Sequence, residues 1–150
     1  MFDNYLINRD SLENEVVDGK VVGFKLKVRN ANYRGVFLSL HNGYYIVVDG
    51  VKYPNSVQTF EINGKKPRTY AELSKAVYEH WDYVDEGILH IAAPGGLEPG
   101  MHTIEFQQSV LAAYGYMPTD EEWVKCAPEP GTGAGSDKTP RIVSYELALK

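Results

Sequence analysis

The sequence is poor in cysteine and has no dense basic run. Cys126 is the only cysteine, which excludes an intrachain disulfide and a cysteine-based metal cluster. It precedes Ala127-Pro128 and has no identifiable partner base, so it is interpreted as a structural residue and not a nucleophile. The formal charge is −5, and Lys and Arg are scattered, which argues against nonspecific binding to nucleic acid or acidic membranes.

Targeting signals and catalytic motifs are also missing. The first ten residues, MFDNYLINRD, have no basic start or apolar stretch, and no window approaches the ~20 apolar residues of a membrane span. We therefore expect a cytoplasmic protein that binds no membrane. The sequence contains no G-x-S-x-G elbow, P-loop or G-x-G-x-x-G motif. The adjacent carboxylates Asp85-Glu86 and Glu121-Glu122 are interpreted as solvated turn residues, so no catalytic residue is nominated.

The composition is typical of one sheet-rich domain. Hydrophobic residues make up 43% of the 150 residues, charged residues 23%, and eleven residues are tyrosines. A chain of this length forms one compact core, so we expect a single domain over residues 1–150. Residues 128–140 combine prolines and glycines with no large apolar side chain, which predicts a mobile surface loop.

Alternation of apolar and polar residues predicts most of the strands. Residues 20–29 (KVVGFKLKVR) and 141–150 (RIVSYELALK) alternate at period two, and a longer alternation runs from His102 to Tyr116. Further short strands are expected at residues 44–48, 57–62 and 87–93. The dipeptides Asp18-Gly19 and Asp49-Gly50 predict tight hairpin turns.

One segment has the pattern of a helix. Thr69 and Glu72 form a Ser/Thr-x-x-Glu capping box, and apolar residues then recur at helical spacing up to Trp81, which predicts one short helix over residues 69–81. Together with the strands, this predicts an all-β fold: an antiparallel β-sandwich of about eight or nine strands with one short helix.

Residues 93–106, APGGLEPGMHTIEF, contain two Pro-Gly signals close together. Such a segment can cradle a ligand or turn the chain from one sheet to the other. Because its glycines precede no helix, a phosphate would find no helix N-terminus there, and the corner is favoured. Leu97 is expected to turn inward, and Pro99-Gly100 to begin the next strand.

The histidines give the strongest metal signal. His90 and His102 flank the corner, and if their strands paired as a hairpin the two imidazoles could share a metal. Two ligands do not make a site, and alternation places Glu105 on the opposite face from His102. His41 is expected in a turn, and His80 at a helix end, where it would interact favourably with the dipole. No metal site is predicted in this chain.

Residues 29–40, RNANYRGVFLSL, interrupt two apolar strands with polar residues. Tyr33 and Arg34 lie in an expected loop, and aromatic residues and arginine are enriched at the energetic centres of protein interfaces. The alternative is that Arg34 pairs with a local carboxylate and Tyr33 packs on the sheet.

Several segments occur in a characteristic order: VVDGKVVGFKLKVRNANYRGVFLSL, VDGVKYP, a segment around Trp81, APGGLEPGMHTIEF, and Tyr-Met-Pro at 116–118. In this order they resemble the small β subunit of bacterial C-glycoside deglycosidases. The resemblance covers residues 1 to about 118 and the final strand, but not the Gly/Pro-rich loop between them.

The resemblance implies that the chemistry belongs to another chain. In that family a larger TIM-barrel α subunit carries the acid/base residues and a divalent metal, expected to be manganese, and the β subunit is a sandwich docked beside its active site. The implied substrate is a C-glucoside of flavonoid or isoflavone type, oxidised to the 3-keto sugar. The ketone acidifies the proton at C2, so a base can remove it and the aglycone can leave C1 in a lyase reaction.

The resemblance also implies what this chain contributes. It would be noncatalytic, would hold no cofactor of its own, and would form αβ pairs in a larger hetero-oligomer. Tyr33, Arg34 and Gly35 are the family-matching positions expected at the subunit interface. Two other functions remain open: a stand-alone carbohydrate-binding or adaptor sandwich, and a small metal-dependent enzyme that uses His90 and His102.

Overall fold

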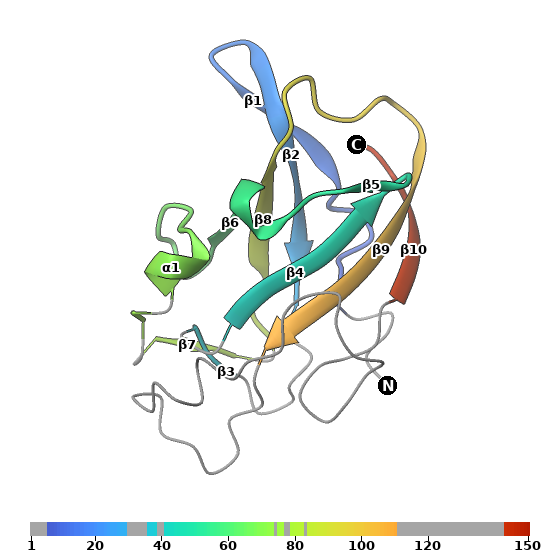
Figure 1. Cartoon of the computed structure of the whole chain (residues 1–150). Coiled ribbons are helices and arrows are strands. Elements are labelled where there is room, and N and C mark those ends of the chain that lie inside the picture. The colour runs from blue at the N-terminus through green and yellow to red at the C-terminus, as the bar shows by residue number, and fades with distance from the viewer. Residues whose placement is uncertain are drawn as a thin grey trace.

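The computed structural model describes residues 6–29, 36–38, 41–73, 75–76, 79–82, 84–110 and 143–150. Over these residues the chain forms two four-stranded antiparallel sheets that face each other across a shared core (Figure 1). A two-stranded sheet and one short helix lie beside them. The expected all-β sandwich is therefore confirmed, with eight strands in the two main sheets of the described part.

The first sheet has the strand order β1–β2–β8–β6. Its strands are β1 (Glu13–Val17), β2 (Lys20–Val28), β8 (Gly87–Ala92) and β6 (Gln58–Glu61). The alternation predicted for β2 is present: Phe24, Leu26 and Val28 are buried, whereas Lys25 and Lys27 reach solvent on the outer face.

The second sheet has the order β10–β9–β4–β5. Its strands are β10 (Val143–Ala148), β9 (Met101–Val110), β4 (His41–Val48) and β5 (Val51–Lys52). The prediction of a turn at His41 is wrong, because His41 begins β4 and pairs with Val110. A shift in register between His41 and Gly43, where Gly43 has a φ of 103°, accounts for the turn-like sequence.

Both predicted hairpin turns are confirmed. Asp18 and Gly19 join β1 to β2 with φ values of 52° and 77°, and Asp49 and Gly50 join β4 to β5 with values of 50° and 85°. Two consecutive positive φ angles are what a two-residue hairpin needs to match the twist of its strands.

The core lies between the two sheets and is rich in aromatic rings. Tyr44 of β4 stacks on Phe106 of β9 at 4.9 Å between ring centroids, and it faces Phe60 of β6 in the other sheet at 6.3 Å. Phe60 in turn contacts Trp81 at 5.1 Å. Aromatic side chains bury the largest apolar areas, so these contacts join the two sheets.

The corner predicted at residues 93–106 is confirmed. β8 ends in the first sheet and β9 begins in the second, so residues 93–100 cross between the sheets (Figure 1). Asn14 holds the crossing by two hydrogen bonds with the backbone of Leu97, at 2.9 and 2.8 Å. Leu97 packs against the core, as expected.

The helix is much shorter than predicted. α1 spans only Tyr70–Leu73, although its capping box forms: the Thr69 amide donates to Glu72 Oε1 at 3.0 Å, and the Glu72 amide donates to Thr69 Oγ1 at 3.3 Å. The chain then enters β7 (His80–Trp81), which pairs with β3 (Val36–Phe37).

His80 is therefore a strand residue, and its predicted place at a helix end is wrong. The buried Trp81 accounts for the difference, because its indole packs on Phe60 and donates to the Asp85 carbonyl at 2.8 Å. A short 3₁₀ helix (Asn55–Val57) precedes β6. Within the described residues, no helix is both long and apolar enough to span a bilayer.

Candidate functional site

The hairpin that would bring His90 and His102 together does not form. His90 lies on β8 in the first sheet and His102 on β9 in the second, because the corner moves the chain between sheets. The metal pair considered from the sequence is therefore ruled out. Among the described residues, no three His, Cys, Asp or Glu side chains are placed to hold an ion together.

His90 lies on the outer face of the first sheet between two carboxylates. Its Nδ1 is 2.8 Å from Glu15 Oε1, and its Nε2 is 2.7 Å from Glu61 Oε1. His90 is only 8% exposed. Each ring nitrogen of His90 therefore has a carboxylate oxygen, which is a hydrogen-bond acceptor, within hydrogen-bond distance. The imidazole holds the two carboxylates in fixed positions on this face.

Gly23 makes this arrangement possible. β2 lies between β1 and β8, so Glu15 has to reach across β2 to contact His90. The β2 residue opposite Glu15 is Gly23, which has no side chain to block the path. A Cβ at position 23 would lie 1.9 Å from the Ile91 carbonyl oxygen, so only glycine allows β2 and β8 to approach this closely.

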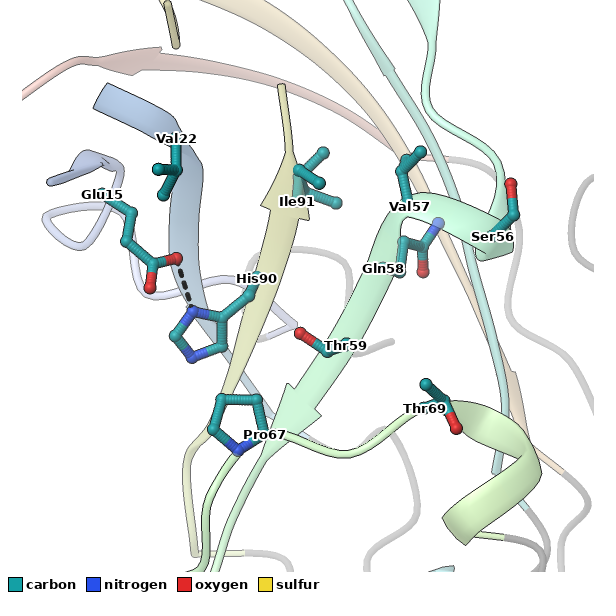
Figure 2. Close-up of a pocket in the computed structure, with 11 residues that line it drawn as sticks. Glu15, Val22, Ser56, Val57, Gln58, Thr59, Pro67, Thr69, His90 and Ile91 are labelled. Carbon is teal, nitrogen blue, oxygen red and sulfur yellow. Dashed lines mark hydrogen bonds and ion pairs between the residues drawn. The ribbon is translucent and has the colours of Figure 1, made fainter. Parts of the chain in front are cut away.

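A pocket of about 270 Å³ opens beside His90 (Figure 2). Figure 2 shows side chains from β1, β2, β8, β6 and the start of α1 around it. Its polar lining includes Glu15, Thr59 and His90, and its apolar lining includes Val22, Val57 and Ile91. The pocket thus presents hydrogen-bonding groups and hydrocarbon surface to the same space.

His102 joins three segments at the start of β9. Its Nδ1 lies 2.5 Å from Asp49 Oδ2 in the β4–β5 turn, and its Nε2 donates to the Glu98 carbonyl at 2.6 Å. Burial lowers the pKa of His102, but these hydrogen bonds outweigh it and the pKa is raised above its usual value. The hydrogen bond from His102 lowers the pKa of Asp49. This contact is a charged clamp that joins the β4–β5 turn, the corner and β9.

The predicted interface residues Tyr33, Arg34 and Gly35 lie outside the described residues, as does the predicted loop at 128–140. The residue that leads into the interface segment, Arg29, is described and firmly held. Its guanidinium pairs with Glu86 at 3.0 Å, and its carbonyl accepts a hydrogen bond from Gln108 Nε2 at 2.8 Å.

The carboxylate partners of both histidines were missed from the sequence. Asp49 was assigned only to a turn, and Glu15 and Glu61 to no role. Strand alternation alone could place Glu61 and His90 on exposed faces, but it does not show which strands are neighbours. The pairing of β8 with β6 brings Glu61 to His90, and the pairing of β2 with both β1 and β8 brings Glu15 there.

Comparison with known proteins agrees with the resemblance. A family model described as C-glycoside deglycosidase beta subunit matches residues 2–114. The chain belongs to this family. The matched residues include the whole first sheet and three strands of the second, β4, β5 and β9.

A curated relative from Eubacterium cellulosolvens is named C-glycoside deglycosidase beta subunit. It is 33% identical to this chain over 97 residues, which cover 65% of each protein. The matched part of the chain thus spans just under two thirds of that relative. The name of the family implies a partner subunit and a role within an enzyme complex.

Proposed function

We propose that this chain is the noncatalytic β subunit of a heteromeric C-glycoside deglycosidase and docks beside the active site of a TIM-barrel α subunit. The observation that carries this proposal is the family match over residues 2–114. The complex, located in the cytoplasm and built from αβ pairs, cleaves the carbon–carbon bond of 3-oxo-C-glucosides of flavonoid or isoflavone type.

The proposed reaction is an elimination. A base of the α subunit removes the C2 proton that the C3 ketone acidifies, the C1–C2 double bond forms, and the bond from C1 to the aglycone breaks. The aglycone carbon takes up a proton. The charge that develops on the C3 oxygen is of the kind that a divalent metal, manganese in this proposal, stabilises.

Two histidines of this chain, His90 and His102, support placing that metal in the α subunit. Both ring nitrogens of His90 and of His102 already contact groups of the same chain. A metal would have to displace these partners, and a ring nitrogen that carries a proton cannot bind a metal. His90 and His102 therefore do not fit the metal site.

Activity measurements test the division of labour between the subunits. The chain and the proposed TIM-barrel α subunit would be purified separately and together, then assayed for aglycone release from a 3-oxo-C-glucoside. We expect release only from the mixture, and co-elution of the two chains on size exclusion. Full activity from either protein alone, or a β chain that stays monomeric beside the barrel, would contradict the proposal.

The interface is proposed at Tyr33, Arg34 and Gly35. Arg34→Ala is expected to weaken subunit association by about 1 to 3 kcal/mol, as truncation of an interface centre does. The matched control is Lys20→Ala, which also removes one positive charge. Lys20 is exposed and begins β2, whereas the segment that contains Arg34 follows the end of β2 in the sequence. Equal dissociation constants for both variants, measured by titration calorimetry, would place the interface elsewhere.

A further inference from the structure

The pocket beside His90 has no role in the function proposed above. It lies near the start of β2, around Val22, whereas the segment proposed as the interface follows the end of β2 at Val28. Its lining comes from β1, β2, β6 and β8, which backbone pairing holds together, and from the 3₁₀ helix and the loop before α1. We propose that this pocket binds a neutral, polyhydroxylated ring of monosaccharide size.

The volume of the pocket suits a small ligand. Pockets for drug-sized ligands measure about 300 to 1,000 Å³, and this pocket of about 270 Å³ lies just below that range. A single sugar or cyclitol ring is of suitable size.

The charges exclude an anionic ligand. The acidic side chains of Glu15 and Glu61 flank His90 on both sides. No Lys or Arg is among the described residues that line the pocket. Lys25, next to His90 on β2, pairs with Glu13 at 3.6 Å. A phosphate or carboxylate would therefore meet repulsion.

The hydrogen-bonding groups suit hydroxyls. Thr59 is directly opposite His90 on the neighbouring strand, and its hydroxyl has no hydrogen-bond partner among the described residues. Glu15 contacts His90 through one oxygen, which leaves the other oxygen as an acceptor. Sugar hydroxyls both donate and accept, so one hydroxyl can donate to Glu15 while another accepts from Thr59.

The apolar part of the pocket lining suits the C–H faces of a sugar ring. Val22 and Val57 add partly exposed hydrocarbon surface to the lining beside these polar groups. Val22 is 39% exposed, which leaves apolar area for a ligand to cover. A sugar ring has C–H faces as well as hydroxyl edges and can satisfy both kinds of surface at once.

The test is an NMR titration of the full ¹⁵N-labelled chain with methyl β-D-glucopyranoside, alone and in complex with its barrel partner. We expect saturable shifts of the amides of Thr59, His90 and Ala92, and none of these with glucose 6-phosphate. Thr59→Val should weaken binding about two- to tenfold, because it removes one hydrogen bond and keeps the shape of the side chain. Thr103→Val, the same change on the exposed face of the other sheet, should leave binding unchanged.

Glu15→Gln is the second variant and should also weaken binding. Two results would overturn the proposal: no shifts at these amides with the neutral glucoside, or shifts that both pocket variants leave intact. Tighter binding of glucose 6-phosphate would overturn the assignment of a neutral ligand. Because the titration needs no deglycosylation, its failure is distinct from failure of the proposed enzyme function.

Discussion

The clamp at His102 makes stability depend on pH at the scale of one residue. Burial opposes the charged imidazole, yet the hydrogen bonds to Asp49 and to the Glu98 carbonyl leave its pKa raised in the folded protein. A raised pKa means that the folded state holds the proton more tightly than the unfolded state. The stabilisation is complete below the unfolded pKa of about 6.5 and is lost as pH rises through the higher folded value.

The stability that Asp49 contributes depends on pH in the opposite direction. Its pKa is lowered in the folded protein, so this stability is lost as pH falls through the folded value. We therefore predict that His102→Gln costs most stability between about pH 4 and pH 6.5 and progressively less at higher pH. The measurement is the urea unfolding midpoint of the unmodified protein and of His102→Gln at each pH in this range. The difference between the two midpoints isolates His102, because the other histidines titrate in both proteins. A difference that does not change with pH would mean that the clamp carries no charge.

At the scale of elements, Glu79 ties the turn after β6 to the start of β7. Its carboxylate accepts two hydrogen bonds from Arg68, at 3.0 and 2.7 Å, and one each from Lys65 and Asn63. The bonds from Arg68, partly opposed by burial, hold the pKa of Glu79 at about 2. Glu79 and Arg68 side chains are each 15% exposed, so this ion pair is mostly shielded from water.

We predict that Glu79→Gln destabilises the fold by about 2 kcal/mol, because it leaves the Arg68 charge without its partner. The control is Glu13→Gln, which breaks a longer, exposed pair with Lys25 and should cost less than about 0.5 kcal/mol. The free-energy cost of Glu79→Gln should shrink as pH falls from about 5 towards 2. The stabilisation by a carboxylate with a lowered pKa is complete above its unfolded pKa and is lost as pH falls towards its folded pKa. If Glu79→Gln and Glu13→Gln lowered the free energy of unfolding in urea by the same amount, the prediction would be wrong.

Alternation and turn chemistry predicted individual elements well. The buried face of β2, the Asp-Gly hairpins and the corner at 93–100 are all confirmed, because each depends on residues close together in sequence. The helix over 69–81 failed beyond Leu73. The spacing of its apolar residues matched a helix. The packing of Trp81 on Phe60 in the core nevertheless stabilises the fold more than extending the one-turn helix α1 as far as Trp81 would.

At the scale of the whole molecule, the sequence could not predict which strands are neighbours. Alternation shows which residues share a face, but a strand pairs according to contacts with segments far along the chain. His90 and His102 were considered together because their strands are consecutive, yet those strands lie in different sheets. The outer-face pocket escaped prediction for the same reason, and the interface at Tyr33, Arg34 and Gly35 stays a prediction from family resemblance.

The final strand completes the second sheet, and its loss should abolish folding. β10 pairs only with β9 in the described sheet, and it buries Tyr145 and Leu147 in the core. Removing one such side chain costs about 2 to 5 kcal/mol, so losing both approaches the 5 to 15 kcal/mol stability of a typical domain. A chain that ends at residue 142 should show no cooperative thermal unfolding.

A chain that ends at residue 148 is the control for this truncation. It keeps β10 and loses the partly buried side chain of Leu149 and two backbone hydrogen bonds, from Leu149 to Gly100 and from Lys150 to Leu12. Each is worth about 1 kcal/mol, so this chain should unfold cooperatively at a slightly lower temperature. If the chain that ends at 142 melted as cooperatively as this control, β10 would be an addition to a sandwich already stable without it. Because the family match ends at residue 114, before β10, the two truncations also test whether the matched region folds without the strand that covers β9.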